Sequence, residues 1–259
     1  MLNRTGFSGV LLAGVLVGSA SLILCAAERS KAGGTATSKA GDINVINSHV
    51  VIGGNMVAGT DSGLVVGNGR RVTRSVPVAA DFHGLDLSGL FKTEVVCGPA
   101  ASVAVVIDEN LQPLLTASVK EGVLSLRFTK PVQTKKSPQL KITLPLLDIL
   151  LMSGGDEVRV ADVKGKSLRL NHEGTGAVTL AGKVDDFSCT VSGIGEVDAS
   201  RLACSSAEIA ISGVGGVTCR PNAKLTASLS GIGGIRCLTH PAKVEKQATG
   251  IGDVEFVEK

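Results

Sequence analysis

Three carboxylates stand at one position of a glycine-rich phrase that recurs in the second half of the chain. They are Glu157, Glu196 and Asp253, each three residues after a glycine. A pair of facing carboxyl groups is what general acid–base hydrolysis requires. If each phrase marks one coil of a stacked fold, Glu157 and Glu196 lie two coils apart, about 10 Å. That separation favours solvated turn residues, and the neighbouring acids Asp185 and Asp186 have the same interpretation.

Metal chemistry finds little support in these phrases. Residues 193–198 are a fragment of the calcium-binding β-roll repeat, which carries an aspartate in every turn, but the other phrases lack that acid. Calcium also prefers six or more oxygen ligands. The histidines lack the spacing of zinc ligands; they are His49, His83, His172 and His240. We therefore expect no catalytic residue, no cofactor and no metal site.

The phrase itself is the strongest signal in the sequence. Its first glycine recurs at intervals of 20, 19, 20, 18 and 19 residues, as Gly154, Gly174, Gly193, Gly213, Gly231 and Gly250. Slips of one residue around a fixed period are typical of stacked repeats, whose turns absorb changes in length.

Apolar residues recur at every second position on both sides of these glycines, as Leu170, Val178 and Leu180 do around Gly174. A period of two belongs to a strand with one buried face, and the glycines permit the φ > 0 geometry of a tight corner. Each unit thus predicts a strand, a glycine corner, a second strand and a looser turn.

Units of about 19 residues cannot bury such a face alone, so we expect them to stack with parallel strands about 4.8 Å apart. The predicted fold is all-β, a right-handed parallel β-helix or β-solenoid. A sandwich of ordinary hairpins explains the alternation but not one aligned phrase repeated six times.

The repeat units also contain serines that could contact a ligand and cysteines that could form a disulfide. Ser192, Ser212 and Ser230 alternate away from the core, and a structural role in the turn is favoured over ligand contact. Cys219 and Cys237 share one aligned position in adjacent units, within reach of a disulfide. Parallel in-register side chains point the same way and fit a disulfide poorly, so buried thiols are the favoured alternative.

Residues that break the repeat pattern are where a site is expected, if there is one. Asp156 replaces the second glycine of the first phrase, Glu173 replaces the serine of the second, and His172 falls in an apolar column, where an interior histidine is favoured over a metal ligand. A polysaccharide-processing enzyme would instead gather Asp148, Asp156 or Glu173 into one acidic cluster on the early coils.

The amino-acid composition disfavours some classes of binding partner. The 259 residues carry a net charge of +3, no Trp, no Tyr and six Phe. Single-stranded nucleic acids stack on aromatic side chains and sugars usually do, and the sequence has no basic stripe. We expect no nucleic-acid partner.

Three segments are expected along the chain. Residues 1–27 have the charged start, apolar run and small residues of a signal peptide, with cleavage after Ala27. Lipidation at Cys25 is disfavoured because the bulky Leu24 precedes it, and an uncleaved anchor is the remaining alternative. Residues 28–76 are expected to be a linker and an irregular glycine-rich arm, and residues 77–259 the β-helical domain, with Asp108 as the N-cap of a helical turn.

The chain resembles the bacterial putative auto-transporter adhesin head, or GIN, domain family. The resemblance rests on the opening residues 82–87, on residues 108–115 followed by residues 123–126, and on the Ser-Gly-x-Gly ladder at Ser192, Ser212 and Ser230. It implies an exported β-helical domain, with adhesion suggested by the family name, and the substitutions Asp156 and Glu173 imply irregular early corners.

We therefore expect an exported non-enzymatic module of the periplasm, outer membrane or cell surface. Its partner is expected to be an unidentified protein or glycan, and the signal segment is its expected link to the membrane. Two alternatives stay open: a polysaccharide-processing enzyme on the same scaffold, and a purely structural protein of the envelope.

Overall fold

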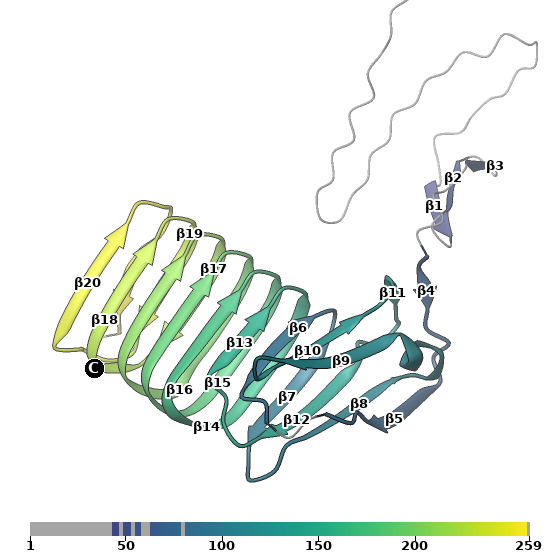
Figure 1. Ribbon diagram of the computed structural model, residues 1–259. Coiled ribbons are helices and arrows are strands. Elements are labelled where there is room, and N and C mark those ends of the chain that lie inside the picture. Colours follow the sequence, from purple (N-terminus) through teal and green to yellow (C-terminus); the bar gives the residue numbers. More distant parts are fainter. Residues whose placement is uncertain (1–42, 47–48, 53–54, 58–62, 79–80, 258–259) are drawn as a thin grey trace, which may run out of the picture.

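The computed structural model describes residues 43–46, 49–52, 55–57, 63–78 and 81–257 (Figure 1). The expected signal peptide, Cys25 and the first part of the expected linker lie outside these residues. No helix in the described ranges is long and apolar enough to cross a membrane.

A parallel β-solenoid makes up most of the described chain, as the repeats predict. Its strands wind from one face to the other and stack side by side towards the yellow end in Figure 1. They are β13 (Ile149–Met152), β14 (Gly155–His172), β15 (Thr175–Val191), β16 (Ile194–Ile211), β17 (Val214–Cys219), β18 (Pro221–Leu229), β19 (Ile232–Cys237), β20 (Lys243–Ala248) and β21 (Val254–Phe256).

The predicted columns are confirmed by the strand register. Val158 pairs with Val178, Val178 with Val197 and Val197 with Val217, and these side chains are buried. Stacking equivalent strands therefore buries one continuous apolar core, which no single coil encloses.

Close backbone packing explains the first glycine of each corner. A Cβ on Gly174 would lie 1.9 Å from the carbonyl oxygen of Gly154, and one on Gly213 would lie 2.0 Å from that of Gly193. The expected positive φ belongs to the second glycine instead, at 147° in Gly176. Both glycines let the coils approach, since a Cβ on Gly176 would lie 1.9 Å from the carbonyl oxygen of Asp156, and the second glycine also supplies the bend.

A further coil precedes the six that the repeats predict. It consists of β6 (Gly84–Ser88) and β7 (Lys92–Cys97). β6 pairs in parallel with β13, so Leu85 lies beside Leu150, and β7 pairs in parallel with β14. Gly89 is the first rung of the glycine ladder, because a Cβ on Gly154 would lie 1.9 Å from its carbonyl oxygen.

The chain then leaves the solenoid and returns out of order. The excursion comprises β8 (Ser102–Asp108), the 3-10 helix η1 (Glu109–Leu114), β9 (Leu115–Lys120), β10 (Val123–Phe128), β11 (Val132–Gln133) and β12 (Gln139–Leu144). β10 pairs in parallel with β6, and β12 with β7, so these two strands form a coil outside the earlier one. β9 and β8 pair with them in antiparallel fashion and cover this end.

Part of the expected linker and arm packs onto this covered end. β5 (Arg71–Ser75) pairs with β8, and β4 (Val65–Val66) pairs with β11. Earlier in the chain, β1 (Ile43–Ile46), β2 (His49–Ile52) and β3 (Asn55–Val57) form a small antiparallel sheet.

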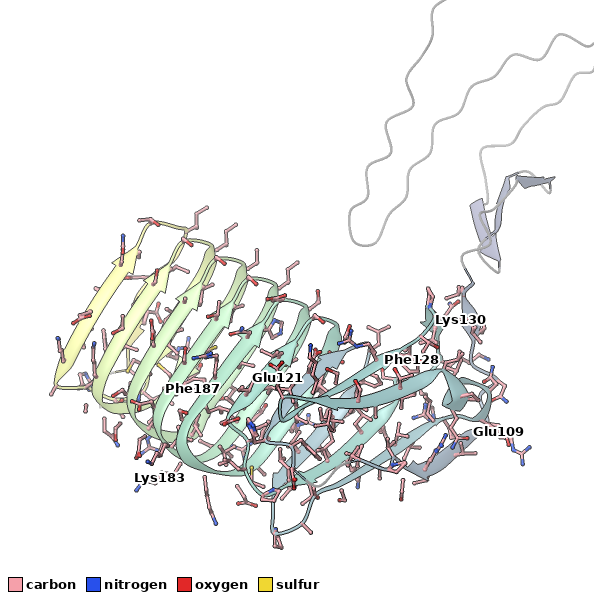
Figure 2. All side chains as sticks on the ribbon, viewed as in Figure 1. Glu109, Glu121, Phe128, Lys130, Lys183 and Phe187 are labelled. Atoms are coloured by element: carbon pink, nitrogen blue, oxygen red, sulfur yellow. The ribbon has the colours of Figure 1, made fainter. Side chains whose placement is uncertain are left out.

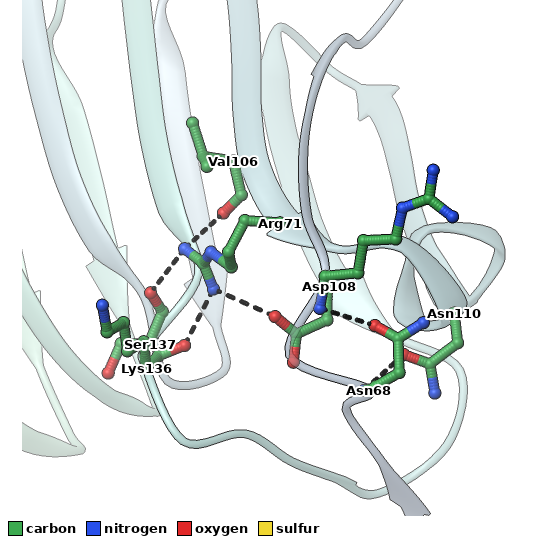
Figure 3. A network of polar contacts seen from close by, with 8 residues as sticks. Asn68, Arg71, Val106, Asp108, Asn110, Lys136 and Ser137 are labelled. Carbon is green, nitrogen blue, oxygen red and sulfur yellow. Dashed lines mark hydrogen bonds and ion pairs between the residues drawn. The ribbon is translucent and has the colours of Figure 1, made fainter.

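A polar network fixes β5 to the covered end (Figure 3). Asp108 is the N-cap residue of η1, as predicted, but its side chain makes no capping hydrogen bond to the helix. Its buried carboxylate lies 3.6 Å from Arg71, whose guanidinium also donates to the carbonyl oxygens of Val106, Lys136 and Ser137. Because the Asp108 carboxylate is attracted to the partly buried Arg71 guanidinium, it points away from the backbone N–H groups at the start of η1.

The opposite end of the solenoid is open. Every residue of β20 is exposed, and Lys246 occupies the column that Leu170 and Ile209 occupy in earlier coils. Its ammonium lies 3.7 Å from the carboxylate of Asp253. A charge in an inward position discourages other strands from pairing with an open edge.

Candidate functional site

The tips of the glycine corners carry a row of exposed aliphatic side chains. The residue after the first glycine is Ile194, Val214, Ile232 or Ile251 in four consecutive coils, and these side chains are 53%, 44%, 49% and 71% exposed. Their backbones pair in register from one coil to the next. Figure 2 shows side chains projecting in line from this edge of the solenoid. We call these four residues the aliphatic row.

The row is flanked on one side by small hydroxyl residues. They precede the first glycines and are Ser192, Ser212, Ser230 and Thr249. Of these four hydroxyl groups, all in the described part of the chain, only that of Ser230 donates to a backbone carbonyl, that of Ile211 at 3.5 Å. Ser192 and Ser212 therefore leave their hydroxyl groups to the surface, beside the exposed aliphatic carbons.

A hollow interrupts the row at the two early corners, where the tip residues are Gly155 and Thr175. It has a volume of about 960 Å³, a floor of glycine backbone, and walls that include Leu90 and Ile194. We call this hollow the notch. The aliphatic tips of the later corners are replaced here by Gly155 and Thr175, and the side chain of Leu90 reaches over Gly155, where a Cβ would lie 2.5 Å from it.

Three acidic residues border the notch: Asp156, Glu157 and Glu173. Glu157 is neutralised by Arg159 and by Lys92, whose ammonium lies 3.2 Å from its carboxylate. Glu173 has no ion-pair partner among the described residues. The notch therefore presents one uncompensated exposed carboxylate.

Asp156 is the buried acid of the notch, with 2% of its surface exposed. Its Oδ1 accepts a hydrogen bond from the backbone N–H of Phe91 at 2.7 Å, and its Oδ2 has no partner in the described structure. Burial raises the pKa of Asp156 to about 7, and the bond from Phe91 only partly opposes this. This carboxyl group therefore titrates near neutral pH.

His172 confirms the expectation of an interior histidine. It is fully buried between Met152 and Val191 in its column. Its ring fills the space that a side chain at Gly195 would need, since a Cβ there would lie 2.7 Å from Nε2. Burial lowers the pKa of His172, and nearby backbone groups oppose this in part. Within the described residues neither ring nitrogen of His172 has a hydrogen-bond partner, so the ring packs as a neutral core residue.

The profile of the family described as putative auto-transporter adhesin, head GIN domain, matches residues 81–241. The chain belongs to this family. The match covers both the glycine ladder and the excursion before it, which confirms the resemblance drawn from the sequence. No curated protein gives a significant match.

One solved structure shares the fold of this GIN domain, and two others align with it at lower TM-scores. A protein from Bacteroides fragilis, described as a putative adhesin, is 21% identical and aligns over 74% of this chain and 100% of its own, with a TM-score of 0.58. A putative adhesin from Parabacteroides merdae is 21% identical over 75% and 99% of the chains, with a TM-score of 0.49. A protein from Parabacteroides distasonis described as lipid-binding is 20% identical over 75% and 100%, with a TM-score of 0.44.

The acids that would support polysaccharide processing are divided between two places in this GIN domain. Oδ1 of Asp148 lies at hydrogen-bond distance from Nδ1 of His83, 2.7 Å, and Asp148 borders a separate polar groove of about 580 Å³ with Arg169, Asp186 and Glu208. Asp156 and Glu173 border the notch instead. The predicted cluster of all three acids does not form.

The remaining acids and histidines of the GIN domain have local structural roles or face solvent. Asp198 accepts a hydrogen bond from the backbone N–H of Ser200, and Asp253 accepts one from that of Val254. The ring of His240 lies near Phe256. The side chain of His49 lies outside the description. Across the described ranges, no three His, Cys, Asp or Glu side chains gather as metal ligands.

Cys219 and Cys237 lie side by side in β17 and β19, as the alignment predicts. Both thiols are free and buried, in agreement with the favoured alternative. Their shared hydrogen bond raises the pKa of Cys219. Burial also raises the pKa of Cys189 and of Cys204 to about 12. The hydrogen bond with Cys219 lowers the pKa of Cys237 to about 6. Burial, and not a high pKa, therefore keeps the Cys237 thiol from reagents in the folded protein.

Proposed function

We propose that this protein is an exported, non-enzymatic binding module of the cell surface. We further propose that its contact surface is the corner face, defined as Leu90, the notch and the aliphatic row. The family and the solved relative from Bacteroides fragilis are described as putative adhesins, which supports an adhesin-like surface module. The observation that carries the proposal is the unbroken exposure of aliphatic side chains on four stacked corners.

Exposed apolar rows of this kind are unfavourable in a free protein and favour association. Burying the exposed half of one such side chain contributes about 1 kcal/mol. The whole row therefore contributes on the order of 4 kcal/mol, from which the entropic cost of association is subtracted. That balance suits a weak contact strengthened by many copies on one surface, which is how adhesion works.

The acids around the notch support a non-enzymatic role. A general acid must come within hydrogen-bond distance of the group that it protonates, but the carboxylate of Asp156 is sealed from solvent. Glu157 is held by two cations, and Asp148 is in another groove. Around the notch, Glu173 is the one exposed carboxylate without an ion-pair partner among the described residues, so no second free carboxyl group lies beside it there.

Surface location is testable with the variant Ser212→Cys. Ser212 is exposed on the corner face, whereas the cysteines from Cys189 onward are buried and Cys97 is partly covered. A membrane-impermeant maleimide should therefore label intact cells that express the variant, and the unsubstituted protein should give little labelling. If labelling of Ser212→Cys requires disruption of the envelope, the protein is internal and the adhesion proposal fails.

A further inference from the structure

We infer that the corner face binds an amphipathic polypeptide helix that lays its apolar stripe along the aliphatic row and places a basic side chain in the notch. This inference rests on the proposed function, because it names the partner of the same surface. It goes further by committing to the chemistry and the secondary structure of that partner.

The spacing of the row favours a helix. Stacked coils repeat about every 4.8 Å, and an α-helix advances 5.4 Å per turn. An extended strand presents side chains of one face only about every 6.7 Å. Across the three intervals between Ile194 and Ile251 the mismatch grows to about 2 Å for a helix and about 6 Å for a strand. One apolar residue per helical turn can therefore contact one corner per coil.

The distribution of charge favours a basic residue at one end of that stripe. Hydroxyl residues flank the four aliphatic tips on one side. Near the early end of the row, two exposed carboxylates have no ion-pair partner among the described residues: Glu173 at the notch and Glu196, two residues after Ile194. The stem of a lysine or arginine would pack beside Ile194, which pairs with Thr175 in the coil of Glu173, while its charged group meets Glu173. An anionic membrane or an acidic glycan would be repelled by the same carboxylate.

Two synthetic 18-residue helical peptides test the inference by fluorescence anisotropy. Both carry a leucine stripe with one leucine per turn, and they differ only in a terminal lysine or glutamate. The intact protein should bind the lysine peptide at least tenfold more tightly. The variant Glu173→Ser, which restores the residue of the other corners, should remove most of this preference by weakening the lysine peptide and by relieving the repulsion of the glutamate peptide.

Further variants separate the two contributions. Val214→Thr keeps the side-chain shape and Ile232→Ser shortens it; each should weaken both peptides about threefold to tenfold, because both peptides use the row. Glu208→Ser, at an exposed acid of the other groove, should change neither affinity. Circular dichroism confirms that each variant is folded.

The outcomes distinguish the inference from the proposed function. If the row variants weaken binding but the lysine peptide has no advantage, the corner face is a contact surface and the basic helix is wrong. If neither the row variants nor Glu173→Ser alters peptide binding, the inference fails altogether. If oligomers of glucosamine bind with a dependence on Glu173 and the peptides do not, the partner is a cationic glycan and the inference is overturned. The proposed function fails separately, if Ser212→Cys is labelled only inside the envelope.

Discussion

Replacing Asp156 by asparagine should remove a large pH dependence of stability. Asparagine has the same shape, and its Oδ1 still accepts the hydrogen bond from Phe91. The change eliminates the ionisable proton and nothing else of comparable size. We therefore expect the Asp156→Asn variant to behave at every pH like the protein with Asp156 protonated.

The magnitude follows from the pKa of Asp156, which burial raises from 3.8 to about 7. Because the folded protein binds this proton more tightly than the unfolded chain, the stabilisation is fully present below about pH 4 and is lost as pH rises through 7. The full shift corresponds to about 4 kcal/mol, of which about 2.6 kcal/mol falls between pH 5 and pH 8. With 2% of the residue exposed, solvent screening reduces this little.

Urea unfolding of both proteins at pH 5 and pH 8 measures the effect. The difference between the two proteins cancels every other titrating group, including His172. Relative to the unsubstituted protein, Asp156→Asn should gain about 2.6 kcal/mol on going from pH 5 to pH 8. The exposed acid Asp186, changed to asparagine, should give no such gain. Parallel pH profiles for the protein and Asp156→Asn would mean that Asp156 ionises in contact with water, and the reasoning from burial would be refuted.

Three further predictions concern the scaffold. Gly213→Ala should destabilise the protein by about 3 kcal/mol or more in urea unfolding, because the new Cβ would lie 2.0 Å from the carbonyl oxygen of Gly193. Gly216→Ala should be nearly neutral, because its new Cβ would lie 3.6 Å from the nearest atom. Equal effects of the two variants would contradict the glycine ladder. Lys246→Val should cause end-to-end association, measured by light scattering, because it removes the inward charge from the open edge. The matched change Lys183→Val should leave the protein monomeric. If Lys246→Val is also monomeric, the edge is protected by something other than this charge. In denaturant without reductant, all five cysteines from Cys97 onward should react with a thiol reagent, and two missing thiols would reveal a bond between Cys219 and Cys237.

The periodic part of the fold was predictable, because its signal is local. The glycine intervals and the alternation of apolar residues predict the coils and the columns from Leu150 onward, and the register confirms them. The coil of β6 and β7 was missed because the chain leaves the solenoid for about 50 residues before the next coil begins, and because Phe91 stands where later corners have glycine. A period search cannot span such a gap.

The candidate site was partly predictable. Asp156 and Glu173 were chosen as breaks in the repeat, and both border the notch. The alternation that turns Ser192 outward also turns Ile194 outward, so the aliphatic row could have been deduced from the alignment. The notch could not, because its far wall is Leu90 from the missed coil, and that neighbour is set by pairing between distant strands.

Site-specific photocrosslinking in cells tests the central claim most directly, that the corner face is the contact surface. A benzophenone amino acid would replace Val214 on the corner face or Lys183, which lies at the other edge of the solenoid (Figure 2). We predict a discrete polypeptide adduct at position 214 that Glu173→Ser weakens, and none at position 183. An adduct at position 183 but not at position 214 would contradict the account.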